Sequence, residues 1–179
     1  MRAPAAFLLA IAGLLAPVAC ARASDGSLEA AVKATYLYKL APFVEWPAAP
    51  ASAAPSSFAI CVQADEAFAA LVQKATVGQE VVGRPIAVHS LARLDGSSGC
   101  QIAYVGGSAA QSQDAALKSL DAAGVLTVTD EDRGPARGVV HLLLSGGRVR
   151  FDIDRNAAAR EGLTISSKLL SLALHVRGR

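Results

Sequence analysis

Short apolar runs alternate with helix-like segments through the middle of this chain, and this alternation constrains the fold more than any other feature. Residues 58 to 62 (FAICV) and 100 to 105 (CQIAYV) are typical of buried strands. Each is followed by a segment with helical spacing and then by another strand-like run, at residues 85 to 91 and 125 to 129. This order predicts two β-α-β units, whose right-handed crossovers place their strands in parallel.

The C-terminal part of the chain adds antiparallel pairing to this pattern. A Ser-Gly-Gly turn at residues 145 to 147 separates two strand-like runs, residues 139 to 144 and 148 to 154, and predicts a β-hairpin. We therefore expect an α/β fold in one domain. Its mixed sheet of about six strands lies between helical layers, with β-α-β units followed by the hairpin and a C-terminal helix.

Two further helices are expected at the ends of the domain. The first covers residues 28 to 44, and Pro42 should kink or end it. Its apolar stripe consists of Val32, Tyr36, Leu40 and Phe43. The last helix is capped by Ser166 or Ser167 and extends to Val176.

The first 23 residues have the layout of a secretory signal peptide, with Arg2, a short apolar run and a small-residue cleavage site at Ala21 and Ala23. A lipid-modified Cys20 is the alternative, which Pro17 disfavours. We expect residues 1–23 to be removed and residues 24–179 to form the α/β domain of a periplasmic protein. The mature domain then carries 15 Lys+Arg against 15 Asp+Glu, because Arg2 and Arg22 leave the total of 17 basic residues. Without a basic stripe, nucleic acid is not an expected partner.

Two cysteines remain after the leader, Cys61 and Cys100. An even pair in an exported chain favours one disulfide, because the compartment is oxidising, and two buried free thiols are the alternative. No His or Cys lies near either at ligand spacing, which disfavours a metal site. A disulfide that closes a loop of about 40 residues would stabilise the fold by roughly 3–4 kcal/mol.

No group of residues in the sequence supplies the parts of a catalytic site, so we expect neither an enzyme nor a cofactor. Ser108 follows two glycines but lacks the later glycine of a nucleophile elbow, and is interpreted as a helix N-cap. The strand residues His89 and His141 have no neighbouring carboxylate or cysteine in the sequence, and His175 falls on the expected last helix. The acidic run at residues 130 to 132 is interpreted as a solvated loop, because arginines follow it.

A series of motifs runs along the mature chain in order. They are F-V-E-W-P (43–47), F-A-I-C-V (58–62), G-R-P-I-A-V (83–88), C-Q-I-A-Y-V (100–105), G-V-L-T-V-T-D (124–130), G-G-R-V-R-F-D-I-D (146–154) and A-A-A-R-E-G-L-T-I-S-S-K-L-L (157–170). No single motif is diagnostic, but the set together resembles the YfiR-like family of periplasmic proteins, over nearly the whole mature chain.

The resemblance implies a repressor that binds the periplasmic part of a membrane-bound diguanylate cyclase and keeps cyclic di-GMP low. It also implies an outer-membrane lipoprotein that sequesters the repressor, and a disulfide state that affects folding and activity. Cys61 and Cys100 match the family's cysteine pair between these strands. The chain lacks a further pair, so redox sensing by a second disulfide is not carried over, and Pro42 departs from the helix-compatible residue expected there.

The aromatic segment near the start of the mature chain is the candidate surface for a partner or a ligand. It comprises Tyr36, Phe43, Glu45 and Trp46. The alternative is that Phe43 and Trp46 anchor the first helix in the core, with Glu45 capping backbone amides or pairing with an arginine.

We expect an exported regulatory protein that acts by protein–protein contact, with a homodimer mate as another occupant of the aromatic surface. The alternative function is a periplasmic small-molecule-binding protein, or an accessory subunit of an envelope transport or sensor system.

Overall fold

A computed structural model describes residues 25–47 and 56–178 of the chain. The expected signal peptide at residues 1–23, and Cys20 with it, lie outside this range. Among the residues it describes, no helix is both long and apolar enough to cross a membrane.

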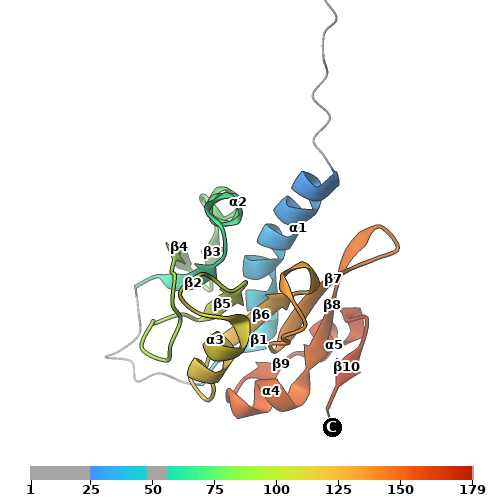
Figure 1. The fold of residues 1–179 in the computed structure, drawn as a ribbon. Coiled ribbons are helices and arrows are strands. Elements are labelled where there is room, and N and C mark those ends of the chain that lie inside the picture. The colour runs from blue at the N-terminus through green and yellow to red at the C-terminus, as the bar shows by residue number, and fades with distance from the viewer. Residues whose placement is uncertain (1–24, 48–55, 179) are drawn as a thin grey trace, which may run out of the picture.

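An eight-stranded mixed sheet forms the centre of the fold (Figure 1), in the order β10-β8-β7-β6-β5-β2-β4-β3. The strands are β2 (Phe58–Gln63), β3 (Glu80–Val81), β4 (Arg84–Ser90), β5 (Ile102–Val105), β6 (Leu126–Asp130), β7 (Val140–Ser145), β8 (Arg148–Asp154) and β10 (Val176–Arg177). Strands β4, β2, β5, β6 and β7 run parallel, and β8 is antiparallel to β7. The predicted α/β fold, its β-α-β units and its hairpin are confirmed. The sheet exceeds about six strands because β3 and β10, two residues each, are too short to show a sequence pattern.

Helices lie against this sheet, and a small two-stranded sheet completes the fold. The helices are α1 (Asp25–Leu40), α2 (Glu66–Thr76), α3 (Gln113–Ser119), α4 (Arg155–Arg160) and α5 (Ser167–Leu172), with 3-10 turns η1 (Ala41–Phe43) and η3 (Glu131–Arg133). In the small sheet β1 (Val44–Glu45) pairs antiparallel with β9 (Thr164–Ile165). These two strands are far apart in the sequence, and their pairing brings the end of α1 beside α5.

The alternating side chains of the central strands divide the apolar interior into two clusters. Ile60 and Val62 of β2 belong to the larger cluster, which also contains buried residues of α1, α2 and α5. Cys61 belongs to the smaller cluster with Ala116 and Leu120, which lie on and beside α3. Because successive side chains of a strand point to opposite faces, the sheet separates these two clusters. This arrangement agrees with the expected helical layers on both faces of the sheet.

Helix α1 ends earlier than expected, and its buried stripe is shifted by one residue. It stops at Leu40 and continues as a 3-10 turn whose first positions include Pro42, because proline has no N–H to bond four residues back. The buried stripe contains Lys33, Leu37 and Leu40, whereas Tyr36 is only half-buried. Of the expected stripe, Leu40 is buried, Tyr36 and Phe43 are half-buried against the core, and Val32 is not part of that cluster.

Two helix boundaries also differ from the expectation. Ser112, and not Ser108, caps α3, and its hydroxyl accepts from the N–H of Ala115 at 3.3 Å. Ser108 instead donates to the carbonyl of Ala92 at 2.6 Å. At the C-terminus α5 ends at Leu172, and Val176 lies in β10 beside β8, so His175 is not on a helix.

Candidate partner-binding site

Tyr36 and Phe43 line a groove between α1, β8 and α5 that has a volume of about 480 Å³. The Tyr36 hydroxyl donates to the carbonyl of Val149 at 3.4 Å, and its ring meets Phe151 edge-on with centroids 5.9 Å apart. Leu172 contributes a side chain from α5 that is 54% exposed. A second hollow of about 330 Å³ on α1 shares Tyr36 with this groove. Together they form an elongated, largely apolar trough beside α1.

Basic side chains surround this groove. Lys39, Arg148 and Arg150 line it, and Lys168 Nζ lies 5.7 Å from the centroid of the Phe43 ring. Among the described residues, no acidic side chain lines the groove. None of these four cations forms an ion pair with a carboxylate in the part of the chain that the structure describes. The groove therefore combines an apolar floor with cations that pair with no described carboxylate.

Trp46 and Glu45 lie outside this groove. The half-buried Trp46 indole donates to the carbonyl of Gln101 at 3.1 Å, and its ring meets Phe58 edge-on with centroids 5.4 Å apart. Glu45 is exposed on β1 opposite Thr164, and its carboxylate has no hydrogen bond or ion pair with any described residue. The structure thus brings together Tyr36 and Phe43 of the expected surface, but neither Glu45 nor Trp46 joins them.

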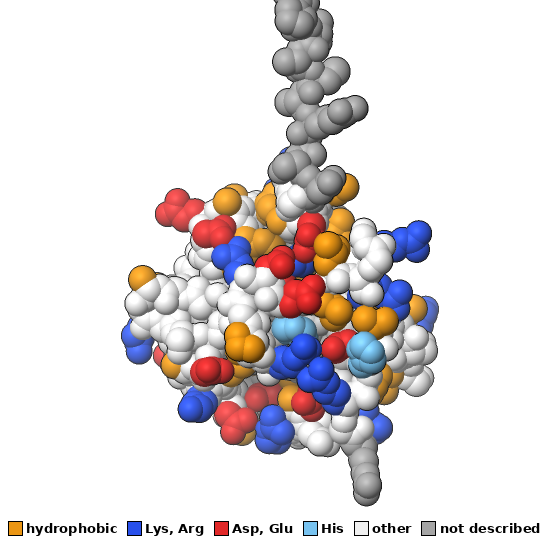
Figure 2. Space-filling model, turned by 45° about the vertical axis from the view of Figure 1, so that its right-hand side comes forward, with side chains coloured by type: hydrophobic (Ala, Val, Ile, Leu, Met, Phe, Trp, Pro, Cys, Tyr) orange, Lys and Arg blue, Asp and Glu red, His pale blue; other side chains and the backbone are white. Residues whose placement is uncertain are grey.

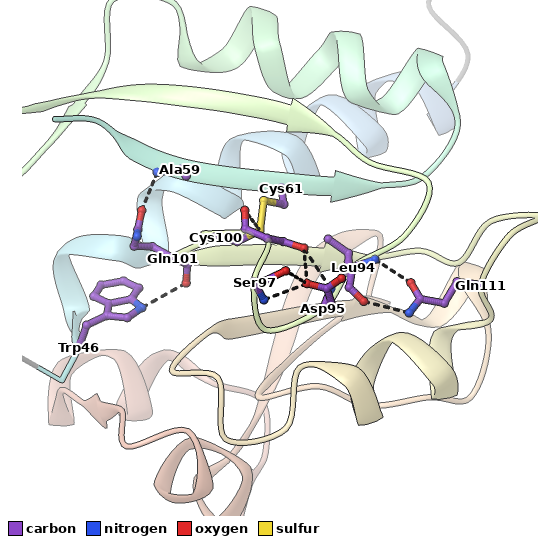
Figure 3. The surroundings of a disulfide bond; sticks show 10 residues. Trp46, Ala59, Cys61, Leu94, Asp95, Ser97, Cys100, Gln101 and Gln111 are labelled. Atoms are coloured by element: carbon purple, nitrogen blue, oxygen red, sulfur yellow. Dashed lines mark hydrogen bonds between the residues drawn. A yellow bond between two sulfur atoms is a disulfide. The ribbon is translucent and has the colours of Figure 1, made fainter. Parts of the chain in front are cut away.

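Cys61 and Cys100 form a disulfide, with their Cα atoms 5.7 Å apart (Figure 3). They can meet because β2 and β5 are adjacent, with Cys61 opposite Ala103. The preceding loop is held by polar contacts: the Gln111 amide bonds both backbone groups of Leu94, at 2.7 and 2.9 Å. In the same loop, hydrogen bonds from Ser97 lower the pKa of the Asp95 carboxyl. The disulfide therefore joins a well-bonded loop to the middle of the sheet.

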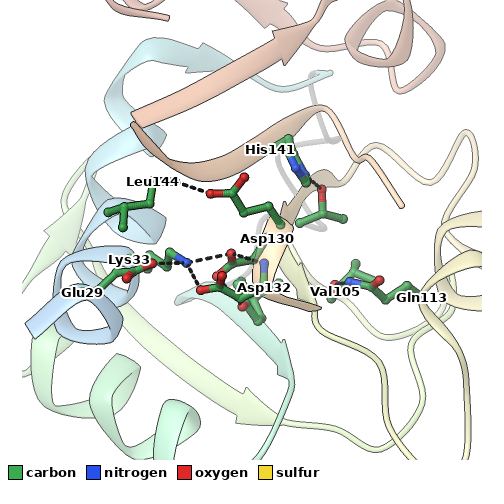
Figure 4. A network of polar contacts seen from close by, with 11 residues as sticks. Glu29, Lys33, Val105, Gln113, Asp130, Asp132, His141 and Leu144 are labelled. Carbon is green, nitrogen blue, oxygen red and sulfur yellow. Dashed lines mark hydrogen bonds and ion pairs between the residues drawn. The ribbon is translucent and has the colours of Figure 1, made fainter. Parts of the chain in front are cut away.

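A buried lysine forms the densest polar cluster (Figure 4). Lys33 Nζ lies 2.6 Å from Glu29 Oε1, 2.7 Å from Asp130 Oδ1 and 2.6 Å from Asp132 Oδ2, and its side chain is 3% exposed. Burial opposes its charge, yet these carboxylates raise the pKa of Lys33 above its ordinary value. Asp130 is buried too, so its expected place in a solvated loop was wrong.

Tyr104 and Arg133 extend this cluster to neighbouring elements. The Tyr104 hydroxyl donates to Asp130 Oδ2 at 3.1 Å, and burial together with the charge of Asp130 raises the pKa of Tyr104. Arg133 pairs with Asp65, which caps α2, at 2.6 Å. The cluster thus joins α1 and α2 to the carboxyl ends of β5 and β6, which is a structural role.

A second ionic cluster lies around Asp152 of β8, two strands from β6 in the sheet. On the face shown in Figure 2, histidine side chains lie against a group of basic and acidic ones. The Asp152 carboxylate, with a side chain 8% exposed, contacts His175 Nδ1 at 2.9 Å, Arg137 at 3.3 Å and Arg177 at 3.6 Å. These contacts fix the edge strand β10 to β8. Nowhere in residues 25–47 and 56–178 do three or more His, Cys, Asp or Glu residues form a group that could hold a metal ion.

The sequence profile of the YfiR/HmsC-like family matches residues 30–174. The chain belongs to the YfiR/HmsC-like family. The resemblance seen in the sequence is thereby confirmed at the level of the family. No curated protein sequence matches the chain. The matched range contains the groove residues, the disulfide and, apart from Glu29, the lysine cluster of this YfiR/HmsC-like protein.

Sequence reasoning missed the buried roles of Lys33 and Asp130 in this YfiR/HmsC-like chain. A lysine four and seven residues before Leu37 and Leu40 falls on the buried face of α1, and that spacing is a signal for a buried ion pair. Leu172 lies on the expected last helix, whose outer face is a candidate contact surface, and it is exposed where α5 ends.

Proposed function

We propose that this YfiR/HmsC-like protein is a periplasmic regulator that binds the periplasmic part of a membrane-bound diguanylate cyclase and thereby lowers cyclic di-GMP signalling. Family membership over residues 30–174 carries the proposal. On this proposal residues 1–23 direct export, residues 24–179 form the regulatory domain, and an outer-membrane lipoprotein competes for it.

The groove supports a binding role. Tyr36, Phe43 and Leu172 combine aromatic and aliphatic surface in one concave site, and Tyr and Phe are enriched at the cores of protein interfaces. Two side chains with raised pKa values, Lys33 and Tyr104, also fit a binding role better than catalysis, because both contact Asp130. They stabilise the junction of α1 with the sheet, and supply no free base or nucleophile.

Repression requires differential binding. The regulator must bind the inactive state of the cyclase's periplasmic part more tightly than the active state, since equal affinity would shift nothing. A difference of about 1–3 kcal/mol changes the equilibrium roughly 5- to 150-fold, which is enough for a switch.

Deletion of the gene in its native host, followed by complementation, tests this function. Deletion should raise cyclic di-GMP and promote biofilm, and the wild-type protein should restore both. Leu172→Asp should fold and keep the disulfide but fail to restore repression, because Leu172 is 54% exposed in the groove. Val77→Asp is the matched control, since Val77 is 77% exposed and lies outside the groove.

An unchanged cyclic di-GMP level after deletion, in a host that contains a cyclase of this kind, would contradict the regulatory function. Small-molecule binding would then become the leading candidate.

A further inference from the structure

Within the described residues, the cations around the groove lack the carboxylate partners that several other basic side chains of this protein have. Lys33, Arg133, Arg137, Arg160 and Arg177 each pair with a carboxylate. The groove cations Lys39, Arg148, Arg150 and Lys168 pair with no carboxylate in residues 25–47 and 56–178. Since they border an apolar surface, a ligand with both apolar and anionic groups would complement them.

The shape of the groove favours a helix over an extended strand. Together with the second hollow, the groove extends along α1 from Ala31 to Leu40, a rise of roughly 14 Å at 1.5 Å per residue, or about two and a half turns. A strand would have to pair with the backbone of β8, where the Tyr36 hydroxyl already bonds the carbonyl of Val149. Helices that bind in grooves use apolar side chains at i, i+3, i+4 and i+7.

We infer that the groove binds an amphipathic helix of a protein partner, with apolar side chains against Tyr36, Phe43 and Leu172 and carboxylates beside the basic residues. The inference rests on the proposed function for the idea of a protein partner, and adds the chemistry of the partner's contacting segment. Charge complementarity of this kind accelerates association and selects among partners with similar apolar faces.

Two synthetic probes test the inference. Each is a staple-constrained helical peptide of about four turns with leucines at i, i+3, i+4 and i+7. One carries glutamates on both flanks and the other carries lysines at the same positions. With the full mature protein and fluorescence anisotropy, the glutamate peptide should bind at least tenfold more tightly at low salt. The difference should shrink in about 0.5 M salt, because salt screens exposed charges.

Charge reversal in the protein should reverse the preference. The double variant Arg148→Glu with Arg150→Glu should bind the lysine peptide more tightly than the glutamate peptide. If the double variant unfolds, Arg148→Glu alone replaces it, because Arg148 is exposed. This single variant should bind the glutamate peptide more weakly than the wild-type protein does. Lys74→Glu with Lys118→Glu changes the net charge equally at exposed positions outside the groove, and should keep the original preference.

Equal binding of the two peptides, no binding of either, or an unchanged preference after charge reversal would overturn the inference. The cyclic di-GMP response to gene deletion is independent of these measurements. A charge preference at the groove with no cyclic di-GMP response would therefore reject the proposed function alone.

Discussion

Lys33 of α1 and Asp130 at the end of β6 are 97 positions apart in the chain and form a buried ion pair, with Nζ 2.7 Å from Oδ1. Both side chains are at most 4% exposed. The pair fixes the helix that carries Tyr36 to the strand end that also binds Tyr104. The geometry of the groove therefore depends on it.

Replacing Lys33 by methionine should destabilise the fold by about 3–5 kcal/mol, because Asp130 would remain as a buried and uncompensated charge. Urea unfolding at pH 7 measures the loss. Lys39→Met on the same helix is the control and should change stability by about 0.5 kcal/mol or less, since Lys39 is exposed. Equal losses in the two variants would contradict this role of the pair.

Replacing Val82 by asparagine should stabilise the protein by about 1 kcal/mol. Val82 has φ 50° and precedes Gly83 at φ 70°, so the β3–β4 turn places a β-branched residue in the left-handed region. Asn-Gly is favoured in such turns, and the Val82 side chain is 86% exposed, so little packing is lost. Thermal unfolding checks this. Val77→Asn, at an exposed residue with φ −55°, should bring no gain, and a similar gain there would rule out relief of backbone strain as the cause.

Loss of the Cys61–Cys100 disulfide should cost roughly 2–4 kcal/mol, because the reduced unfolded chain gains conformational freedom. Cys61→Ser is the test, and reduction of the wild-type protein should lower stability to a similar degree. Periplasmic protein should have a mass two hydrogens below that of the reduced form. Two thiols that alkylate freely in native protein would disprove the pairing in the cell.

Stability should fall as the pH drops from about 7 to 5, because of His141. Burial, and then the charge of Arg137, lowers the pKa of His141. Gly138 N–H donates to the Thr129 hydroxyl, which lies 2.9 Å from His141 Nδ1 and can donate to it. The neutral ring is therefore favoured in the fold. Below a pH of about 6.5 the unfolded chain binds a proton that the folded chain does not, so unfolding becomes easier.

Denaturant unfolding across this pH range measures the slope, and His141→Gln should reduce it. His89→Gln, at an exposed position, should leave it unchanged. Two carboxyl groups affect stability in a lower pH range. Hydrogen bonds from Phe68 N–H and Arg133 lower the pKa of Asp65, and a hydrogen bond from Lys33 lowers the pKa of Asp132. Their stabilising contributions are lost below a pH of about 4. A slope between pH 7 and 5 that persists in His141→Gln would contradict the assignment.

Local pattern was sufficient for the central strands and for the hairpin. Residues 58 to 62 and 100 to 105 are short apolar runs bounded by turn residues, and each lies in the sheet as predicted. The disulfide was predicted from the number of cysteines and the expected compartment, while its geometry depends on the adjacency of β2 and β5. Element ends were less predictable: Ser108 and Ser112 are both plausible caps by type, and contacts with Ala92 decide between them.

The candidate site was only partly predictable, because its residues come from elements that are far apart in the chain. Tyr36 and Phe43 carry an aromatic signal in the sequence, and the groove contains both. Leu172 joins them because β1 pairs with β9 and brings α5 beside the end of α1. Arg148 and Arg150 join them because Tyr36 of α1 packs against β8. Trp46 carries the same aromatic signal, but it packs on Phe58 instead.

The sequence by itself determined the α/β class, the parallel β-α-β order, the hairpin and the family, because these depend on local periodicity and on motifs in a fixed order. The tertiary structure decided which face of α1 is buried, which carboxylates surround Lys33 and which cations remain unpaired around the groove. Those properties depend on contacts between residues far apart in the chain, and on the local burial that sets the cost of an unpaired charge.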